Sequence, residues 1–416
     1  MPTAPQPGQT GQASAPDDGF DELELAGLKR LGSAKWAVAR SAGDDVIPSW
    51  VADMDFPAPG PVREALARLA REGDLRYPSG TEAERLEGAW ARRVRERFGW
   101  SPRPGRLRAF TDLVQGTQAV LEVATARDDG VLLLTPSYPP FVDSIRDMGR
   151  RLLAVPAVDD GQGWAFDLEV AKAYATQARA LLLVNPHNPT GRMLTADELG
   201  VLEGLAAEHD LIVISDEVHA DLSLVQKRHL PFASLSPETE ARTVTFYSAS
   251  KSYNLGGMRC AVAHLGNDAV AQALAALPSH LLGSVSTAAV ATTLAAWSPE
   301  GDDWLDRALV RLRANREALG AWFGGDGERA GVKGYAPEAT YLAWLDFRNT
   351  AARGDVAPGK WLVEHARVLL SEGAAFGPGG EGFARVNFAT TPAILEEILS
   401  RIASALGPGG QEPAGT

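Results

Sequence analysis

Cysteine and basic residues are scarce in this sequence. Its 416 residues include one cysteine, Cys260, which excludes an intrachain disulfide and a metal site built from several cysteines. We expect Cys260 to be a small buried residue and the protein to be cytoplasmic. The 40 lysines and arginines are outnumbered by 53 acidic residues, which gives a formal charge of −13. This charge excludes a general nucleic-acid binder and a protein of anionic membrane surfaces, because both need a basic face.

Long apolar segments are also missing. The most apolar stretch, Leu282–Trp297, is interrupted by five serines and threonines, so it is too polar to cross a bilayer and predicts a buried helix. Residues 1–19 lack the basic and apolar regions of a signal peptide and predict a disordered tail. The seven histidines form no H-E-x-x-H pair, so we expect no catalytic metal.

The remaining composition is that of a globular protein. Hydrophobic residues make up 45% and charged residues 22%, which at this length predicts two domains. From about residue 109 to 265, short apolar runs alternate with helical patterns, which predicts an α/β fold with a mostly parallel sheet. The predicted strands are Val131–Leu134, Ala180–Val184, Leu211–Ser215, Thr243–Tyr247 and Cys260–Leu265. In such a sheet, ligands gather at the carboxyl ends of the strands.

The pattern changes after Trp297. A long helix is predicted through Arg307–Trp322, a strand over Tyr341–Phe347, and a final helix that Thr391 and Pro392 begin. We therefore expect a large domain over residues 56–297 and a small α+β domain over residues 298–406. Residues 20–55 should pack with the small domain, and residues 407–416 should form a second disordered tail.

Polar residues stand where three of the predicted strands end. Asn188 lies in the turn Asn185–Gly191, Asp216 ends the next strand, and Lys251 follows the strand after that. Each has a plain structural interpretation, respectively a turn residue, a buried ion pair and a surface cation. Because the carboxyl ends of parallel strands meet at one edge, we instead expect these side chains to form a site, in which the lysine amine can make a Schiff base.

This set of residues resembles that of the fold-type I pyridoxal-phosphate enzymes in the aminotransferase class I/II superfamily. The resemblance covers roughly residues 20–406 and is carried by Asn188-Pro189-Thr190-Gly191, Asp216, Ser248-x-Ser250-Lys251 and Arg259. It implies the fold described above, a pyridoxal 5′-phosphate cofactor and a small amino-acid substrate. It also implies a homodimer in which the two subunits share their active sites.

The resemblance gives each matching residue a role. Lys251 would carry the cofactor and act as the catalytic base, Asp216 would pair with the pyridinium nitrogen, and Tyr138 would stack on the ring. The other cofactor contacts would come from Gly116, Thr117, Asn188, His219, Ser248, Ser250 and Arg259, and Tyr77 would reach the cofactor of the neighbouring subunit.

The phosphate and the substrate would be held by further groups. Gly116 and Thr117 precede a helix predicted over Ala119–Ala126, whose N-terminus would attract the phosphate. Arg385 would bind the substrate α-carboxylate, with Asn188 and Asp53 also at the substrate. We expect a locally cationic site around Lys251, Arg259 and Arg385.

Within the superfamily, the sequence looks most like the MalY/PatB-type C–S β-lyases. Trp50–Phe56, Asp216–His219 and Ser248–Lys251 carry this closer resemblance. It implies α,β-elimination of L-cystathionine or another L-cysteine S-conjugate to a thiol, pyruvate and ammonia. An aminotransferase is the first alternative, because these residues serve both reactions, and a binding or regulatory protein that keeps the fold is the second.

Overall fold

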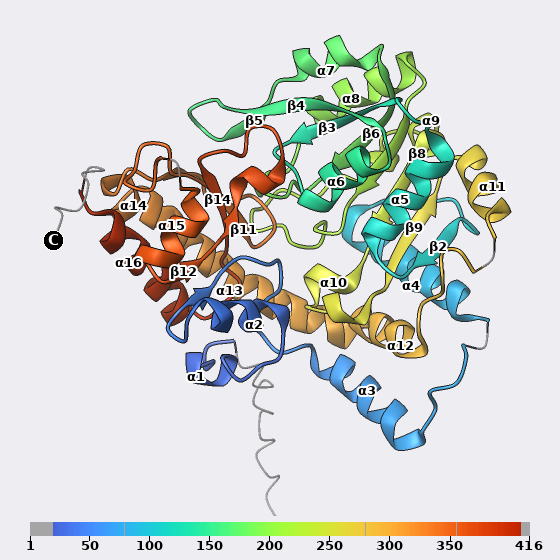
Figure 1. Ribbon diagram of the computed structural model, residues 1–416. Coiled ribbons are helices and arrows are strands. Elements are labelled where there is room, and N and C mark those ends of the chain that lie inside the picture. The colour runs from blue at the N-terminus through green and yellow to red at the C-terminus, as the bar shows by residue number, and fades with distance from the viewer. Residues whose placement is uncertain (1–19, 79, 279, 355, 409–416) are drawn as a thin grey trace, which may run out of the picture.

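The centre of the protein is an eight-stranded sheet. The computed structural model describes residues 20–408 except 79, 279 and 355, so the tail predicted over residues 1–19 and nearly all of the one over 407–416 lie outside the described residues. In sheet order the strands are β2 (Leu107–Phe110), β9 (Ala261–Leu265), β8 (Thr243–Tyr247), β7 (Ile212–Asp216), β6 (Ala178–Val184), β3 (Gly130–Thr135), β4 (Arg151–Asp159) and β5 (Trp164–Phe166) (Figure 1). Strands β4, β3, β6, β7 and β8 are parallel neighbours, and β9 and β5 are antiparallel to theirs. The five strand predictions are confirmed to within two residues.

Helices cover both faces of this sheet, which explains why its strands are apolar throughout. Alternate side chains point to opposite faces of a strand. Leu133 of β3 therefore belongs to a core cluster with α5 (Leu113–Ala124), α6 (Pro139–Asp147) and α11 (Asp268–Ala276). Its neighbour Leu132 belongs to a second cluster with α7 (Leu168–Ala175) and α8 (Ala196–Glu208) on the other face.

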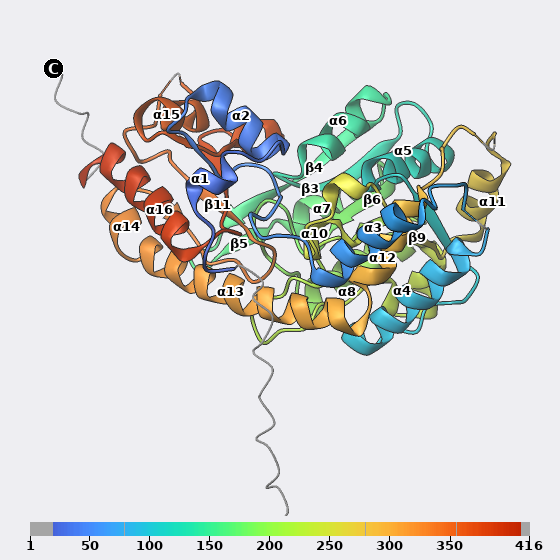
Figure 2. The same ribbon diagram turned by 90° about the horizontal axis from the view of Figure 1, so that it is seen from below.

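A second, four-stranded sheet holds the C-terminal part. Its order is β10 (Lys333–Gly334), β11 (Leu342–Asp346), β14 (Phe383–Asn387) and β13 (Ser371–Glu372). The predicted strand over 341–347 is thus confirmed as β11, and the predicted last helix as α16 (Pro392–Leu406), with Thr391 as its N-cap. The other helices of this region are α14 (Asp326–Arg329), α15 (Pro358–His365) and the 25-residue α13 (Pro299–Phe323), which runs from the central sheet to the second one (Figure 2).

The helix predicted over Leu282–Trp297 is shorter than expected. Its observed range is α12 (Thr287–Ala296), and Ser286 caps it by accepting a hydrogen bond from the amide of Ala289. The serine that looked like an interruption is therefore the start signal, as serine is at many helix N-termini. No helix in the described part of the chain is long and apolar enough to span a membrane.

The N-terminal segment is joined to the C-terminal part by a pair of strands. It contains α1 (Leu25–Leu28), α2 (Ala34–Ala42) and β1 (Ile47–Pro48), and β1 pairs with β12 (Val368–Leu369) of the C-terminal part. It is followed by α3 (Gly60–Glu72) and α4 (Glu82–Phe98), while α9 (Pro237–Arg242) and α10 (Ala249–Ser252) flank β8. The domain boundaries at residues 56, 298 and 406 remain a prediction.

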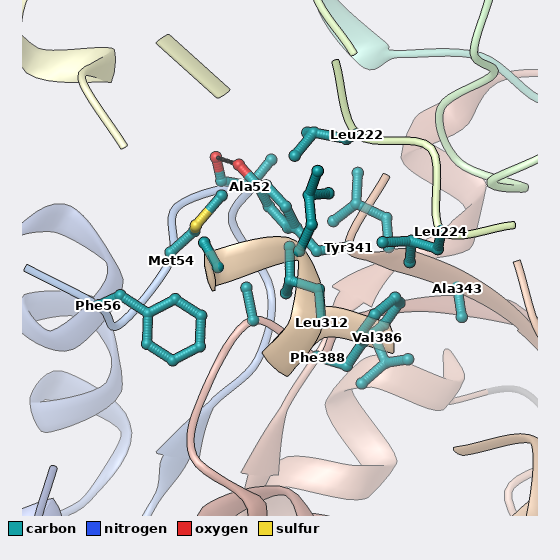
Figure 3. Packing of buried hydrophobic residues seen from close by; sticks show 14 of the residues in the cluster. Ala52, Met54, Phe56, Leu222, Leu224, Leu312, Tyr341, Ala343, Val386 and Phe388 are labelled. Atoms are coloured by element: carbon teal, nitrogen blue, oxygen red, sulfur yellow. Dashed lines mark hydrogen bonds between the residues drawn. The ribbon is translucent and has the colours of Figure 1, made fainter. Parts of the chain in front are cut away.

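Residues 50–56 are fixed to both parts of the protein. Asn387 of β14 donates to the carbonyls of Val51 and Asp53 at 2.6 and 2.7 Å, and Asn254 donates to the carbonyls of Met54 and Phe56 at 3.0 and 2.8 Å. Apolar side chains of the same segment enter the core beside α13 and β14, as Figure 3 shows. This segment is therefore a structural link as well as a motif.

Replacing Tyr341 by phenylalanine should weaken this link measurably. The Tyr341 hydroxyl donates to the Ala52 carbonyl at 2.9 Å in the buried core, as the dashed line in Figure 3 marks. We expect the free energy of unfolding of the cofactor-free protein to fall by about 1 kcal/mol, as for a typical buried hydrogen bond. Urea unfolding measures this loss. Tyr335→Phe is the control, because its hydroxyl bonds the exposed Asp159 and should change stability little.

Gly191 joins the two sheets. It lies in the turn after β6 at φ +70°, a left-handed conformation that favours glycine, and its carbonyl accepts a 2.8 Å hydrogen bond from the amide of Ala339, just before β11. A Cβ atom at Gly191 would lie 2.9 Å from the Leu342 carbonyl oxygen and closer still to Pro337. The turn that carries Asn188 therefore also sets the contact between the sheets.

Candidate active site

A cavity of about 450 Å³ lies at the carboxyl edge of the central sheet. The ends of β6, β7 and β8 form one side of it, and the N-terminal segment and β13–β14 form the other. Nine of the residues predicted for the site line the cavity: Tyr138, Asn188, Asp216, His219, Ser248, Ser250, Lys251, Arg259 and Arg385. The fold thus brings together groups that are separated by up to about 250 positions in the sequence.

Lys251 lies in α10, directly after β8. Its side chain is 25% exposed, toward the cavity, and Nζ donates to the Ala52 carbonyl at 2.8 Å and lies 4.0 Å from Asp53 Oδ1. Burial lowers the pKa of the amine below its ordinary value, and the nearby Asp53 partly opposes this shift. A lowered pKa increases the fraction of neutral, nucleophilic amine near neutral pH.

Asp216 is the last residue of β7 and is 96% buried, as its 4% exposure shows. One carboxylate oxygen accepts from the amide of Val218 at 3.0 Å. Burial raises the pKa of this carboxyl to about 7, which means that the protein alone does not stabilise its charge fully. A cation in the cavity would supply the missing partner and return the pKa toward its ordinary range.

Arg385 of β14 is buried and points at the end of β6. Its Nη1 donates to Asn188 Oδ1 at 2.7 Å, and its Nη2 donates to the Trp50 carbonyl at 2.8 Å and to Ser371 Oγ at 3.2 Å. Burial lowers its pKa to about 10, and its buried Nε has no hydrogen-bond partner among the residues that the structure describes. A buried guanidinium without a carboxylate partner is suited to bind an anion from solution.

His219 and Tyr138 complete the lining around the middle of the cavity. His219 is buried, and its pKa lies well below the ordinary value because of that burial. Within the described part of the chain its Nδ1 has no hydrogen-bond partner. The neutral imidazole can therefore hydrogen-bond a polar group in the cavity. Tyr138 presents a half-buried ring that makes an edge contact with Phe141 at 5.4 Å between ring centroids.

One corner of the cavity is rich in hydrogen-bond donors. Ser248 caps α10, its hydroxyl lies 2.7 Å from the hydroxyl of Ser250, and both serines line the cavity. Leu113 and Val114 also line it, and they are the first residues of α5, whose amides have no acceptor within the helix. Such a helix N-terminus, together with hydroxyl groups and Arg259, could hold an anion.

The prediction for the start of α5 was wrong. The helix begins at Leu113, six residues before the predicted Ala119, because Asp112 caps it by accepting from the amide of Gln115 at 2.8 Å. Gly116 and Thr117 are consequently inside the helix and do not line the cavity. Gly116 is a glycine for a packing reason, since a Cβ there would collide with the ring of Phe246.

Two other predicted residues lie outside the cavity lining. Asp53 faces Lys251 but lines a neighbouring pocket, between the N-terminal segment and residues 254–257. Tyr77 is 99% exposed and contributes nothing to the cavity of its own chain. Its role at a neighbouring subunit therefore remains a prediction.

Several residues that line the cavity were not predicted from the sequence. Trp50 and Phe376 line the cavity near Arg385, and the Arg385 guanidinium lies 4.9 Å above the Phe376 ring. No sequence pattern connects Trp50 or Phe376 with Arg385. Asp112, in contrast, could have been predicted as a helix N-cap, because it directly precedes an apolar run. The three expected cations Lys251, Arg259 and Arg385 line the cavity, together with the carboxyl groups of Asp112, Asp216 and Glu372.

The cavity fits pyridoxal 5′-phosphate. The donor corner at α5 and α10 suits the phosphate, and a pyridinium nitrogen would supply a cation for the buried Asp216. His219 and Asn188 are further polar groups of the lining. Lys251 offers the amine. Arg259 and Arg385 are two separate cationic groups that could each take one of the two anionic groups of a cofactor and a substrate.

Comparisons with known proteins agree with this geometry. The model of the family described as aminotransferase class I and II matches residues 53–402. Cystathionine beta-lyase of Corynebacterium glutamicum is 34% identical, covering 93% of this chain and all of that protein, and cystathionine beta-lyase PatB of Bacillus subtilis is 33% identical, covering 93% and 99%. The structure of the PLP-bound C-S lyase from Staphylococcus hominis superposes with a TM-score of 0.84 at 26% identity, covering 93% of this chain and 98% of that one. The chain belongs to the aminotransferase class I and II family.

Proposed function

We propose that the protein is a pyridoxal-phosphate-dependent C–S β-lyase. Its substrate is L-cystathionine or another L-cysteine S-conjugate, and its products are a thiol, pyruvate and ammonia. The observation that carries the proposal is the convergence of Lys251, Asp216 and Arg385 on one cavity in a chain whose relatives include cystathionine β-lyases.

The cofactor, when bound, withdraws electrons from the substrate α-carbon. Asp216 would pair with the pyridine nitrogen and keep that nitrogen protonated, which sustains the withdrawal. Arg385 binds the α-carboxylate, and Asn188, held 2.7 Å from Arg385, orients the substrate against the sheet edge. The Lys251 amine, whose pKa burial lowers, takes the proton from the α-carbon.

The bond that breaks next is the one between Cβ and sulfur. The electron pair left by the α-proton forms the Cα–Cβ double bond, and the sulfur leaves with the C–S bonding pair as a thiolate, which takes up a proton. The released 2-aminoacrylate reacts with water to give pyruvate and ammonia. The overall reaction therefore converts one conjugate and one water into a thiol, pyruvate and ammonia, and it needs no oxidant or reductant.

The test is a product assay with the holoenzyme. Incubation with L-cystathionine and with a series of other L-cysteine S-conjugates should release pyruvate and an equal amount of thiol. An aminotransferase would instead convert an added 2-oxo acid to its amino acid without forming thiol. That result, with no pyruvate from any conjugate, would contradict the proposal and favour the alternative.

Arg385→Lys should separate substrate binding from cofactor binding. Lysine keeps the charge but cannot pair with a carboxylate through two parallel hydrogen bonds, so we expect kcat/KM to fall by about 30-fold, mostly through a higher KM. Steady-state kinetics measure this change, and the visible spectrum of the bound cofactor should stay the same. An unchanged KM would contradict the assignment of Arg385 to the carboxylate.

We also propose that the protein is a homodimer whose subunits share their active sites, and that it is located in the cytoplasm. The fully exposed Tyr77 supports sharing, because an exposed tyrosine beside the exposed Leu75 is available to a second subunit. The single cysteine supports a reducing compartment. We expect light scattering to give twice the chain mass of 44.2 kDa. Tyr77→Phe should weaken cofactor binding in the dimer, and a monomer with full activity would refute sharing.

A further inference from the structure

The donor corner of the cavity, formed by the N-termini of α5 and α10, contains a carboxylate of the protein itself, that of Asp112. Asp112 lines the cavity beside Leu113 and Val114, and one of its oxygens caps α5. Its other oxygen accepts a hydrogen bond from the guanidinium of Arg259 in an ion pair. The carboxylate thus contacts the two elements that a phosphate would use, the N-terminus of α5 and Arg259.

Both partners of this ion pair are held in place. The Asp112 side chain is 23% exposed and is fixed by its cap to the helix. Arg259 has the left-handed backbone conformation, φ +59°, at the end of the short helical turn Gly256–Met258, and its side chain is 64% exposed. Arg259 therefore extends over the cavity from a constrained backbone, and in the described part of the chain Asp112 is its only ion-pair partner.

The charge balance in this corner is unfavourable for a doubly charged phosphate. The charges of Asp112 and Arg259 oppose each other, so within this corner the α5 amides and the serine hydroxyls supply the attraction for an anion. A negative charge within a few ångströms of a bound anion lowers its affinity, although the partial exposure of Arg259 screens the effect.

We propose that Asp112 is an affinity-setting residue that weakens the grip of the protein on the cofactor phosphate by competing for Arg259 and the N-terminus of α5. The proposal rests on the proposed pyridoxal-phosphate function of the cavity. It predicts that removing the charge while keeping the cap will tighten binding.

Asp112→Asn is the variant that removes the charge and keeps the helix cap. Asparagine is an equally good N-cap, so α5 should stay intact, but it forms no ion pair with Arg259. We expect the Kd of the cofactor-free variant for pyridoxal phosphate to fall about three- to tenfold, with the larger effect at low salt. Asp112→Ser, which also caps, should shift the Kd in the same direction. Asp167→Asn is the matched control, since Asp167 caps α7 outside the cavity lining and should leave the Kd unchanged.

Spectral titration of the cofactor-free proteins measures these constants without any assay of turnover. Pyridoxal, which lacks the phosphate, should bind equally well to wild type and Asp112→Asn, whereas inorganic phosphate should compete more strongly in the variant. Unchanged or weaker pyridoxal-phosphate binding, or an equal gain for pyridoxal, would overturn the proposal. Failure of the wild-type protein to bind pyridoxal phosphate would overturn the proposed function as well.

Discussion

Lys251→Ala should abolish the absorbance band of the lysine-bound cofactor and lower kcat/KM by about 10⁴-fold, at the upper end of what a positioned base contributes. The Lys251 amine faces the cavity and has no neighbouring lysine to replace it among the residues that line that cavity. Spectroscopy and pyruvate release measure the two effects independently. The cofactor should still be retained in part, because the groups that surround the phosphate are untouched.

Lys172→Ala is the control for this variant. Lys172 pairs with Glu169 on the exposed side of α7, so its loss should affect neither the spectrum nor turnover. A Lys251→Ala protein that kept the absorbance band would show that another amine carries the cofactor. Retained turnover without the band would show that the base lies elsewhere.

Asp216→Asn should lower kcat/KM by about 10²- to 10³-fold while the cofactor stays bound, since it removes a charge aimed at the electron-withdrawing ring. The amide oxygen can still accept from the amide of Val218, so the end of β7 should keep its conformation. We expect kcat to fall much more than KM changes. Kinetics with one good S-conjugate, together with cofactor stoichiometry, measure both.

The same substitution at Asp197 is the matched control. Asp197 lies in the first turn of α8 on the protein surface, and its charge does not reach the cavity. Wild-type rates for Asp216→Asn would refute the role of the carboxylate. Loss of the cofactor would show instead that Asp216 serves mainly in binding.

The central sheet and its edge could be predicted because the evidence for them is local. Strands covered on both faces are continuous apolar runs, and the polar residues Asn188, Asp216 and Lys251 follow such runs directly. Once the strands are parallel neighbours, their ends must meet. The strand pattern alone therefore predicts that these three side chains lie together.

The substrate side could not be predicted in the same way. Trp50 contacts Arg385 from 335 positions away in the sequence, whereas Ser371 lies only 14 positions before Arg385. The contacts with Trp50 and Phe376 use a backbone carbonyl and a ring face, which have no sequence signature. The Asp112–Arg259 ion pair likewise depends on where α5 begins. Spatial pairing of this kind follows from tertiary packing and not from local pattern.

The close contact at Gly191 has a stereochemical consequence. Lys251 follows a strand of the central sheet and Arg385 lies in the second sheet, so the proposed proton acceptor and the proposed carboxylate-binding group belong to different sheets, which contact each other where Gly191 bonds Ala339. If these roles hold, the direction in which a substrate presents its Cα–H bond depends on how the two sheets pack at this contact. Displacements of about 1 Å can cost 100-fold in rate. A larger side chain at Gly191 would turn the carboxylate-binding group relative to the base and change which bond at Cα is aligned for cleavage, although it touches neither ligand.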